Sequence, residues 1–111
     1  MIGLLLAVVM VSAPQGVPAE CFSPCTVSAN QPFEVITDAD LAVDSYVLLI
    51  NGQPAGITAH VANGLVAFSH PGFAAASSVT LLVRATRLGV SFTYTDPFAL
   101  SVVKRRIKII R

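Results

Sequence analysis

The sequence predicts an all-β fold class, an antiparallel sandwich of two sheets with about seven strands. Apolar and polar residues alternate in short stretches between residues 32 and 103, which is the period of a strand with one buried face. Turn-forming pairs, among them Asn51-Gly52 and Asn63-Gly64, separate these stretches. No long stretch repeats its apolar residues at the helical period of about 3.6. Short strands joined by tight turns are typical of β-sandwiches.

The first three strands are predicted from this alternation and from the turns that end them. Residues 32–37 place Phe33 and Val35 between polar neighbours, as a half-buried strand does. Residues 45–52 are rich in strand formers and end at an Asn-Gly pair, which favours a hairpin turn. Residues 56–64 end at a second Asn-Gly pair, and we therefore expect a third strand there.

The second half of the domain follows the same pattern. Residues 65–70 form a short strand that stops at a Pro-Gly pair. Residues 72–78 are expected to cross from one sheet to the other. Residues 77–86 alternate aliphatic side chains with Thr and Arg, which predicts one buried and one exposed face. Residues 90–95 and 97–103 then close the domain.

The inward positions of these strands define the predicted core, because each sheet must cover the apolar face of the other. The core is expected to contain Phe33, Val35, Tyr46, Leu48, Ile50, Val66, Phe68, Phe73, Val79, Leu81, Val83, Phe98, Leu100 and Val102. Burying each such side chain contributes about 1.5–3 kcal/mol before chain entropy is subtracted. The domain, residues 20–103, is therefore expected to fold without a metal ion.

The N-terminal segment, residues 1–19, is interpreted as a signal peptide. The chain has 111 residues, enough for one domain, and 54% of them are hydrophobic. Residues 2–11 form an apolar run, which has the length of a signal-peptide core and is too short to span a bilayer as a helix. Val17 and Ala19 suit cleavage before Glu20, although no Lys or Arg precedes the apolar run. The alternative is an uncleaved segment that acts as an anchor or as a buried strand in an assembly.

Cys21 and Cys25 are the only two cysteines, and three residues separate them. A structural zinc site needs more ligands than this pair, and a thioredoxin-like site needs two intervening residues. In an exported protein the pair is expected to form a local disulfide around Pro24. Free thiols are the alternative.

Three stretches together resemble fibronectin type III-like and bacterial immunoglobulin-like domains. They read PFEVITDADLAVDSYVLLINGQPAG (32–56), GLVAFSHPGF (64–73) and VTLLVRATRLGVSFTYTDPFALSV (79–102). The resemblance covers about residues 25–103 and implies an immunoglobulin-like sandwich. Such domains have many unrelated functions, so the resemblance implies no ligand. The cysteine spacing excludes the disulfide that joins the two sheets of antibody domains.

Catalytic and metal sites are not predicted. The chain has no nucleophile elbow, phosphate-binding loop, dinucleotide-binding loop or zinc-protease motif. His60 and His70 lie on different predicted strands or turns, and they are interpreted as structural side chains. Asp38, Asp40 and Asp44 fall in one loop and are weak candidates for binding Ca²⁺, but aspartates also favour turns in solvated loops. The protein is therefore expected to be no enzyme and to need no cofactor.

The basic C-terminal tail, residues 104–111, is the strongest charge feature. It contains five of the seven basic residues: Lys104, Arg105, Arg106, Lys108 and Arg111. The rest of the chain has two basic residues against six acids, a formal charge of −4. Contact with a neighbouring subunit or with an anionic surface is expected, because the charge of the tail complements both. Nucleic acid is not the expected partner, because the body is acidic and the tail has no aromatic residue. An untethered tail is the remaining alternative.

These observations predict a non-enzymatic, exported β-sandwich for binding or adhesion, secreted or on a cell surface, with a protein partner. The alternative is a structural subunit of a virion or filament. In that case the apolar N-terminal segment and the basic tail contact neighbouring subunits.

Overall fold

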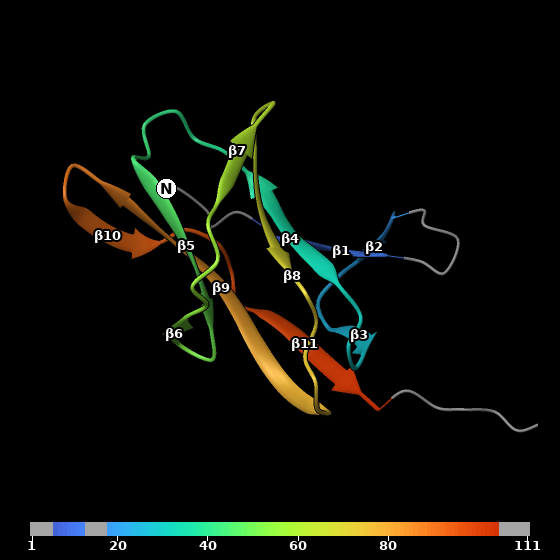
Figure 1. Ribbon diagram of the computed structural model, residues 1–111. Helices are drawn as coiled ribbons and strands as arrows, with labels where there is room; N and C mark the ends of the chain where they lie inside the picture. Colours follow the sequence, from blue (N-terminus) through green and yellow to red (C-terminus); the bar gives the residue numbers. More distant parts are fainter. Residues whose placement is uncertain (1–5, 13–17, 105–111) are drawn as a thin grey trace, which may run out of the picture.

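The computed structural model describes residues 6–12 and 18–104, and these residues form two β-sheets (Figure 1). The strands are β1 Val8–Ser12, β2 Pro18–Cys21, β3 Cys25–Ser28, β4 Phe33–Asp38, β5 Ser45–Ile50, β6 Gln53–Pro54, β7 His60–Ala62, β8 Leu65–His70, β9 Ser77–Arg87, β10 Val90–Thr93 and β11 Phe98–Val103. No helix occurs in the described residues, so none there is long and apolar enough to cross a membrane.

The first sheet has the strand order β2-β1-β4-β8-β7, and all its neighbours are antiparallel. The second has the order β3-β11-β9-β5-β6, with β10 also paired to β9. Its β3–β11 pair is parallel, and the others are antiparallel. The prediction of an all-β fold with two sheets is confirmed.

The described residues form eleven strands instead of the predicted seven or so. The extra strands come partly from the N-terminal segment, which supplies β1 and most of β2. The other two extra strands are β3 and the two-residue β6, which pairs with β5 after the turn at residues 51–52. The predicted break between the last two strands lies at residues 94–97, where the side-chain oxygen of Thr95 accepts a hydrogen bond from the Val83 N–H at 3.0 Å. This side chain replaces a main-chain partner, so β10 and β11 are separate strands beside β9.

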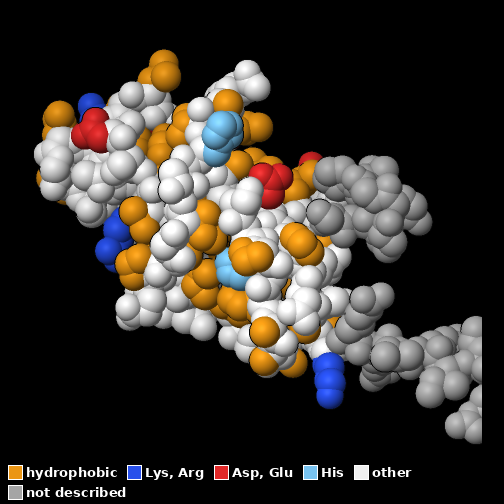
Figure 2. Space-filling view, viewed as in Figure 1, with side chains coloured by type: hydrophobic (Ala, Val, Ile, Leu, Met, Phe, Trp, Pro, Cys, Tyr) orange, Lys and Arg blue, Asp and Glu red, His pale blue; other side chains and the backbone are white. Residues whose placement is uncertain are grey.

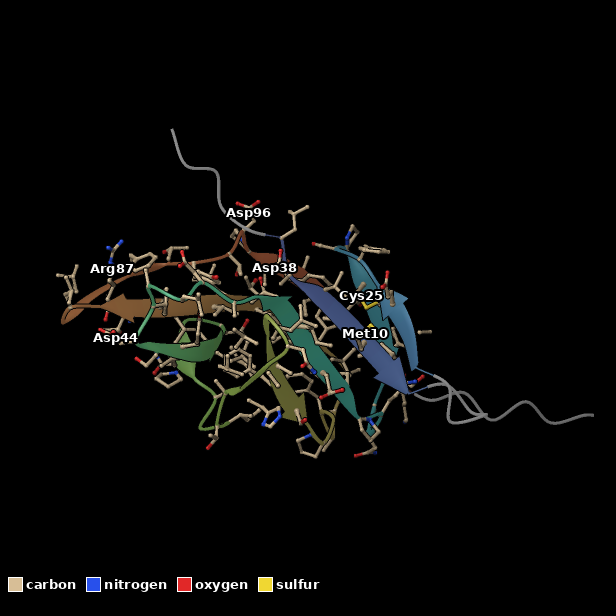
Figure 3. The ribbon with its side chains drawn as sticks, turned by 90° about the horizontal axis from the view of Figure 1, so that it is seen from above. Met10, Cys25, Asp38, Asp44, Arg87 and Asp96 are labelled. Atoms are coloured by element: carbon tan, nitrogen blue, oxygen red, sulfur yellow. A yellow bond between two sulfur atoms is a disulfide. The ribbon has the colours of Figure 1, made fainter. Side chains whose placement is uncertain are left out.

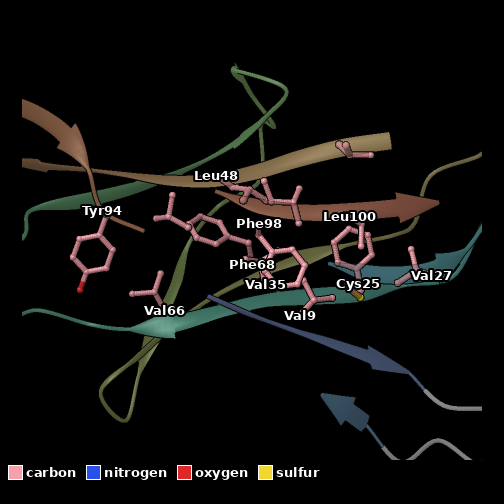
Figure 4. Close-up of a cluster of buried hydrophobic side chains, with 14 of the residues drawn as sticks. Val9, Cys25, Val27, Val35, Leu48, Val66, Phe68, Tyr94, Phe98 and Leu100 are labelled. Carbon is pink, nitrogen blue, oxygen red and sulfur yellow. The ribbon is translucent and has the colours of Figure 1, made fainter. Parts of the chain in front are cut away.

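The core lies between the two sheets (Figure 4). All but three of the predicted core residues are buried, and Tyr46, Ile50 and Phe73 pack half-buried against the others. The alternation rule therefore located the inward faces of the central strands correctly. Residues that this list did not include are also buried: Val9, Cys25, Val27, Leu49, Ala85 and Tyr94.

Strand β1 lies inside the segment that is predicted as a signal peptide. It pairs with both β2 and β4, with Val9 opposite Val35. The Val9 side chain is fully buried in the common core. Residues 8–12 are thus part of the first sheet in the full chain, whereas residues 1–5 and 13–17 lie outside the described residues.

A disulfide joins Cys21 to Cys25. Cys21 ends β2 in the first sheet and Cys25 begins β3 in the second, so the bond connects the two sheets (Figure 3). The short spacing excludes the antibody type of inter-sheet disulfide but not this one, because the chain changes sheets between the two cysteines. Cys25 is also buried in the core, so the bond attaches the β2 edge to the interior.

Candidate binding surface at the loop end of the sandwich

Three connections meet at one end of the sandwich, which we call the loop end. They are the β4–β5 loop (residues 39–44), the β7–β8 turn (63–64) and the β9–β10 turn (88–89). Ala39 donates its N–H to the Gly64 carbonyl at 2.8 Å, which joins the loop to the first turn. The Leu88 N–H donates to Asp44 Oδ2 at 2.7 Å, which joins the β4–β5 loop to the β9–β10 turn. These hydrogen bonds link the three connections to one another.

The Tyr46 side chain fixes the conformation of the β4–β5 loop by hydrogen bonds to its main chain. Its hydroxyl accepts a hydrogen bond from the Asp40 N–H at 2.9 Å and donates to the Asp40 carbonyl at 3.1 Å. Asp40 Oδ1 in turn accepts the Ala42 N–H at 2.8 Å, an aspartate turn of the kind that fixes short loops. The loop conformation is therefore set by side chains that lie below its tip.

Tyr94 connects the loop end to both sheets. It follows β10, and its hydroxyl donates to the carbonyl of Asp38, the last residue of β4, at 2.7 Å. Its ring meets Tyr46 edge to face, with centroids 5.2 Å apart. Burial raises the pKa of Tyr94, and the neighbouring Tyr46, Asp40 and Asp38 act in the same direction. The phenol therefore stays protonated and remains a hydrogen-bond donor at physiological pH.

Large apolar side chains at the loop end are exposed to solvent. Leu41 at the tip of the β4–β5 loop is fully exposed, and Leu88 in the β9–β10 turn is 83% exposed. Val61, Leu65, Val90 and Phe92 beside these turns are exposed as well. Figure 2 shows hydrophobic side chains on the surface at this end, to the upper left. Isolated exposed apolar residues are ordinary, but several of them on loops that hydrogen bonds join make this end a candidate interaction surface.

A groove of about 580 Å³ runs between the β4–β5 loop and the segment 57–61 that leads into β7. Its lining residues are Ala39, Asp40, Leu41, Val43, Asp44, Ser45, Tyr46, Ile57, Thr58, Ala59 and Val61. The groove thus combines aliphatic side chains with two carboxylates. Such a composition suits a partner that carries both apolar and basic groups.

The three aspartates that were weak metal candidates have other roles in the structure. Asp38 offers its carbonyl to Tyr94, and the carboxylates of Asp40 and Asp44 accept main-chain N–H groups. Among residues 6–12 and 18–104, no group of three His, Cys, Asp or Glu side chains is placed to hold a metal ion. The acidic loop therefore has a structural explanation in the described residues.

The two histidines lie apart. His60 is exposed on β7, and half-buried His70 ends β8. The His70 ring stacks on both Phe33 and Phe73, with centroids 4.9 Å and 4.4 Å away, and these two phenyl rings also stack on each other at 5.9 Å. The His70 Nδ1 accepts the Gly72 N–H at 2.9 Å. Burial lowers the pKa of His70. His70 therefore packs against its neighbours as a structural side chain does, whereas the interpretation of His60 stays a prediction.

The basic tail falls largely outside the described residues. Lys104 is exposed at the end of β11, and Arg105, Arg106, Lys108 and Arg111 lie beyond them. The loop end was not predicted from the sequence, although one signal was present. Leu41 and Leu88 are apolar residues inside turn sequences, where solvation favours polar side chains.

Comparisons with protein-family models, with curated proteins and with solved structures find no match for this chain.

Proposed function

We propose that this protein is a non-enzymatic, exported β-sandwich module of the immunoglobulin or fibronectin III-like type, which binds a protein or surface partner through its loop end. The observation that carries the proposal is the exposure of Leu41 and Leu88 on loops that a hydrogen bond through Asp44 joins. Contact residues on fixed loops lose little conformational entropy when a partner binds.

The strand order supports the immunoglobulin-like assignment. Seven of the strands can be named A to G in chain order: β1 is A, β4 is B, β5 is C, β7 is D, β8 is E, β9 is F and β10–β11 is G. The first sheet then contains A-B-E-D and the second contains G-F-C. In the full chain this is the strand arrangement of immunoglobulin constant-type domains, whereas a module that begins at Glu20 would lack strand A, which is β1. In that naming, the B–C, D–E and F–G connections form the loop end. Immunoglobulin variable domains also bind through loops at one end of the sandwich.

The disulfide supports export. A bond between Cys21 and Cys25 persists in oxidising compartments and is reduced in most cytosols. A secreted or cell-surface location is therefore the best match to this chemistry.

An array of extracellular proteins and glycans tests the binding function. The wild-type chain is compared with Leu41→Ser/Leu88→Ser and with a control, Phe22→Ser/Val103→Ser, whose side chains are also exposed but lie outside the loop end. We expect the loop-end variant to lose at least about tenfold in affinity for any ligand found, because two apolar contacts are removed. The control should bind as the wild type does. Equal losses in both variants, or none in either, would contradict the proposal.

A second candidate function is a structural subunit of a virion or filament. It is favoured by one observation: Val9 is fully buried and β1 occupies an interior position of the first sheet. A subunit that keeps its N-terminal segment would use it in this way. Intact-mass measurement of native protein separates the candidates, because an exported module is expected to begin at Glu20 and a subunit to retain residues 8–12.

A further inference from the structure

We propose that the groove at the loop end binds the basic tail, residues 104–111, of a second copy of this chain. This inference rests on the proposed function of the loop end as a binding surface, and it names the occupant of that surface.

The groove has two carboxylates that lack basic partners in the described part of the chain. Asp40 and Asp44 each accept a hydrogen bond from a loop N–H, and each has a second oxygen available. Arg87 lies at the same end, but Figure 3 shows it and Asp44 on opposite sides of the ribbon. Arg84 is exposed on the outer face of the second sheet, in register with Val47 and Thr93. The rim charge of the groove is therefore available to a cationic partner.

The tail has the complementary composition. It contains five basic residues and three isoleucines, and it follows a body whose formal charge is −4. In an extended chain Ile107 and Ile109 share one face, and Arg106 and Lys108 point to the other. Isoleucines can pack against Ile57 and Val61 of the groove while the basic side chains reach the carboxylates at its rim.

A free strand edge lies beside the groove. β7 is the last strand of the first sheet, and within the described residues it pairs only with β8. Its residue Val61 also lines the groove. An extended tail therefore finds unpaired main-chain groups next to the apolar walls, which is the arrangement used in binding by strand addition.

The isoleucines of the tail are too close to Val102 to reach the groove of their own molecule. Val102 pairs with Ser77 at the start of β9, whereas Tyr46 of the groove pairs with Ala85. These positions are eight residues apart along β9, or about 26 Å at 3.3 Å per residue. Even in a fully extended chain, Ile107 and Ile109 can lie at most about 18 Å and 25 Å from Val102. The two isoleucines that are assigned to the groove therefore fall short of it in their own molecule, and we assign the occupant to another copy.

The resulting contact is heterologous, because a tail on one copy meets a groove on the next. Each added copy presents one free groove and one free tail, so the contact produces open chains unless the rotation between copies closes a ring. Apparent mass should therefore rise with concentration. High salt should reverse the rise, because it screens the exposed rim charges.

Light scattering and sedimentation of the full chain at low and high salt test the proposal. We expect the wild type to self-associate at low salt.

The tail variant Ile107→Ser/Ile109→Ser should weaken association about tenfold or more, through loss of apolar contact. The groove variant Val61→Arg should do the same, because it adds bulk and positive charge, whereas Val47→Arg, outside the groove, should have no effect. Asp40→Asn/Asp44→Asn should weaken association about fivefold, whereas Glu20→Gln/Glu34→Gln, with the same change in net charge, should not.

A mixture of the two blocked proteins guards against misfolding as the cause. The groove variant keeps its tail and the tail variant keeps its groove, so together they should form a one-to-one complex that does not grow. A wild type that stays monomeric, a tail variant that assembles normally, or a Val47→Arg variant as defective as Val61→Arg would overturn the proposal. So would tail-dependent binding to phosphatidylserine vesicles with self-association unchanged by Val61→Arg. These outcomes concern self-association only. If Leu41→Ser/Leu88→Ser still loses binding to a ligand found on the array, the proposed function of the loop end stands.

Discussion

Replacing Val9 by alanine tests whether the N-terminal segment stabilises the sandwich. The substitution removes two methyl groups from a fully buried site, which costs about 1.6 kcal/mol at 0.8 kcal/mol per group. If the core does not collapse, a cavity of roughly 40 Å³ remains and adds about 1 kcal/mol. The free energy of unfolding of the full chain should therefore fall by about 2.5 kcal/mol.

Urea unfolding followed by circular dichroism measures this effect. With a slope of about 1–3 kcal/mol per molar urea, the midpoint should fall by about 1 M or more. The matched control is Val103→Ala, the same substitution at an exposed position in β11, which should change stability by less than about 0.5 kcal/mol. Intact mass must show that residues 1–19 are present in each sample.

Equal unfolding midpoints for Val9→Ala, Val103→Ala and the wild type would refute the reasoning. That result would mean that β1 does not pack into the core of the full chain. The distinction matters for function, because a strand that contributes to the core is costly to remove once the domain has folded. If Val9→Ala does destabilise the full chain, processing before Glu20 would have to precede folding.

Three further predictions concern stability. Gly72→Ala should lower the free energy of unfolding in urea by about 3 kcal/mol or more, because its Cβ would lie 2.8 Å from main-chain atoms of Asn30 and Gln31 at φ +109°. The control Gly56→Ala, at φ +72° with open space around the Cβ, should cost about 1 kcal/mol. Similar losses in the two variants would argue against the close approach at Gly72. Burial lowers the pKa of His70 below its ordinary value of 6.5. The contribution of the neutral His70 side chain to the free energy of unfolding is therefore fully present above pH 6.5 and is lost as pH falls through the folded-state pKa. The slope of thermal midpoint against pH should flatten in His70→Asn, but not in His60→Asn, and an unchanged slope in both would exclude His70 as the cause. Removing the disulfide by Cys21→Ala/Cys25→Ala should cost about 2 kcal/mol on the chain-entropy model, and no change in urea midpoint would show that the bond adds nothing to stability.

The parts of the fold that followed from the sequence are those in which one local rule decides the outcome. In β4 and β9, a polar residue between apolar neighbours leaves a single way to face the core, and Phe33, Val35, Leu81 and Val83 are buried as predicted. β1 was not predicted as part of the domain. Its apolar run from Ile2 to Val11 satisfies the hydropathy of a signal peptide and of a buried strand equally, and periodicity cannot separate them.

The loop end could not be predicted from the sequence, because its contacts join residues far apart in the chain. The bond between Leu88 and Asp44 spans 44 residues, and that between Tyr94 and Asp38 spans 56. Neither follows from composition or spacing. The aspartates were recognised as a cluster, but which N–H groups they accept depends on where the β9–β10 turn lies.

The loop end separates the residues that fix the loops from the residues that are free to contact a partner. Asp44, Tyr46 and Tyr94 hold the loops through hydrogen bonds and ring contacts, whereas Leu41 and Leu88 point their side chains into solvent. Substitutions at the two leucines therefore leave folding largely unchanged and alter the surface that a partner meets. Substitutions at Tyr46 or Tyr94 affect both, because these rings belong to the packed interior as well as to the loops. If the loop end binds a partner as proposed, this division would let its specificity change without loss of the sandwich, as binding on loops supported by a rigid scaffold requires.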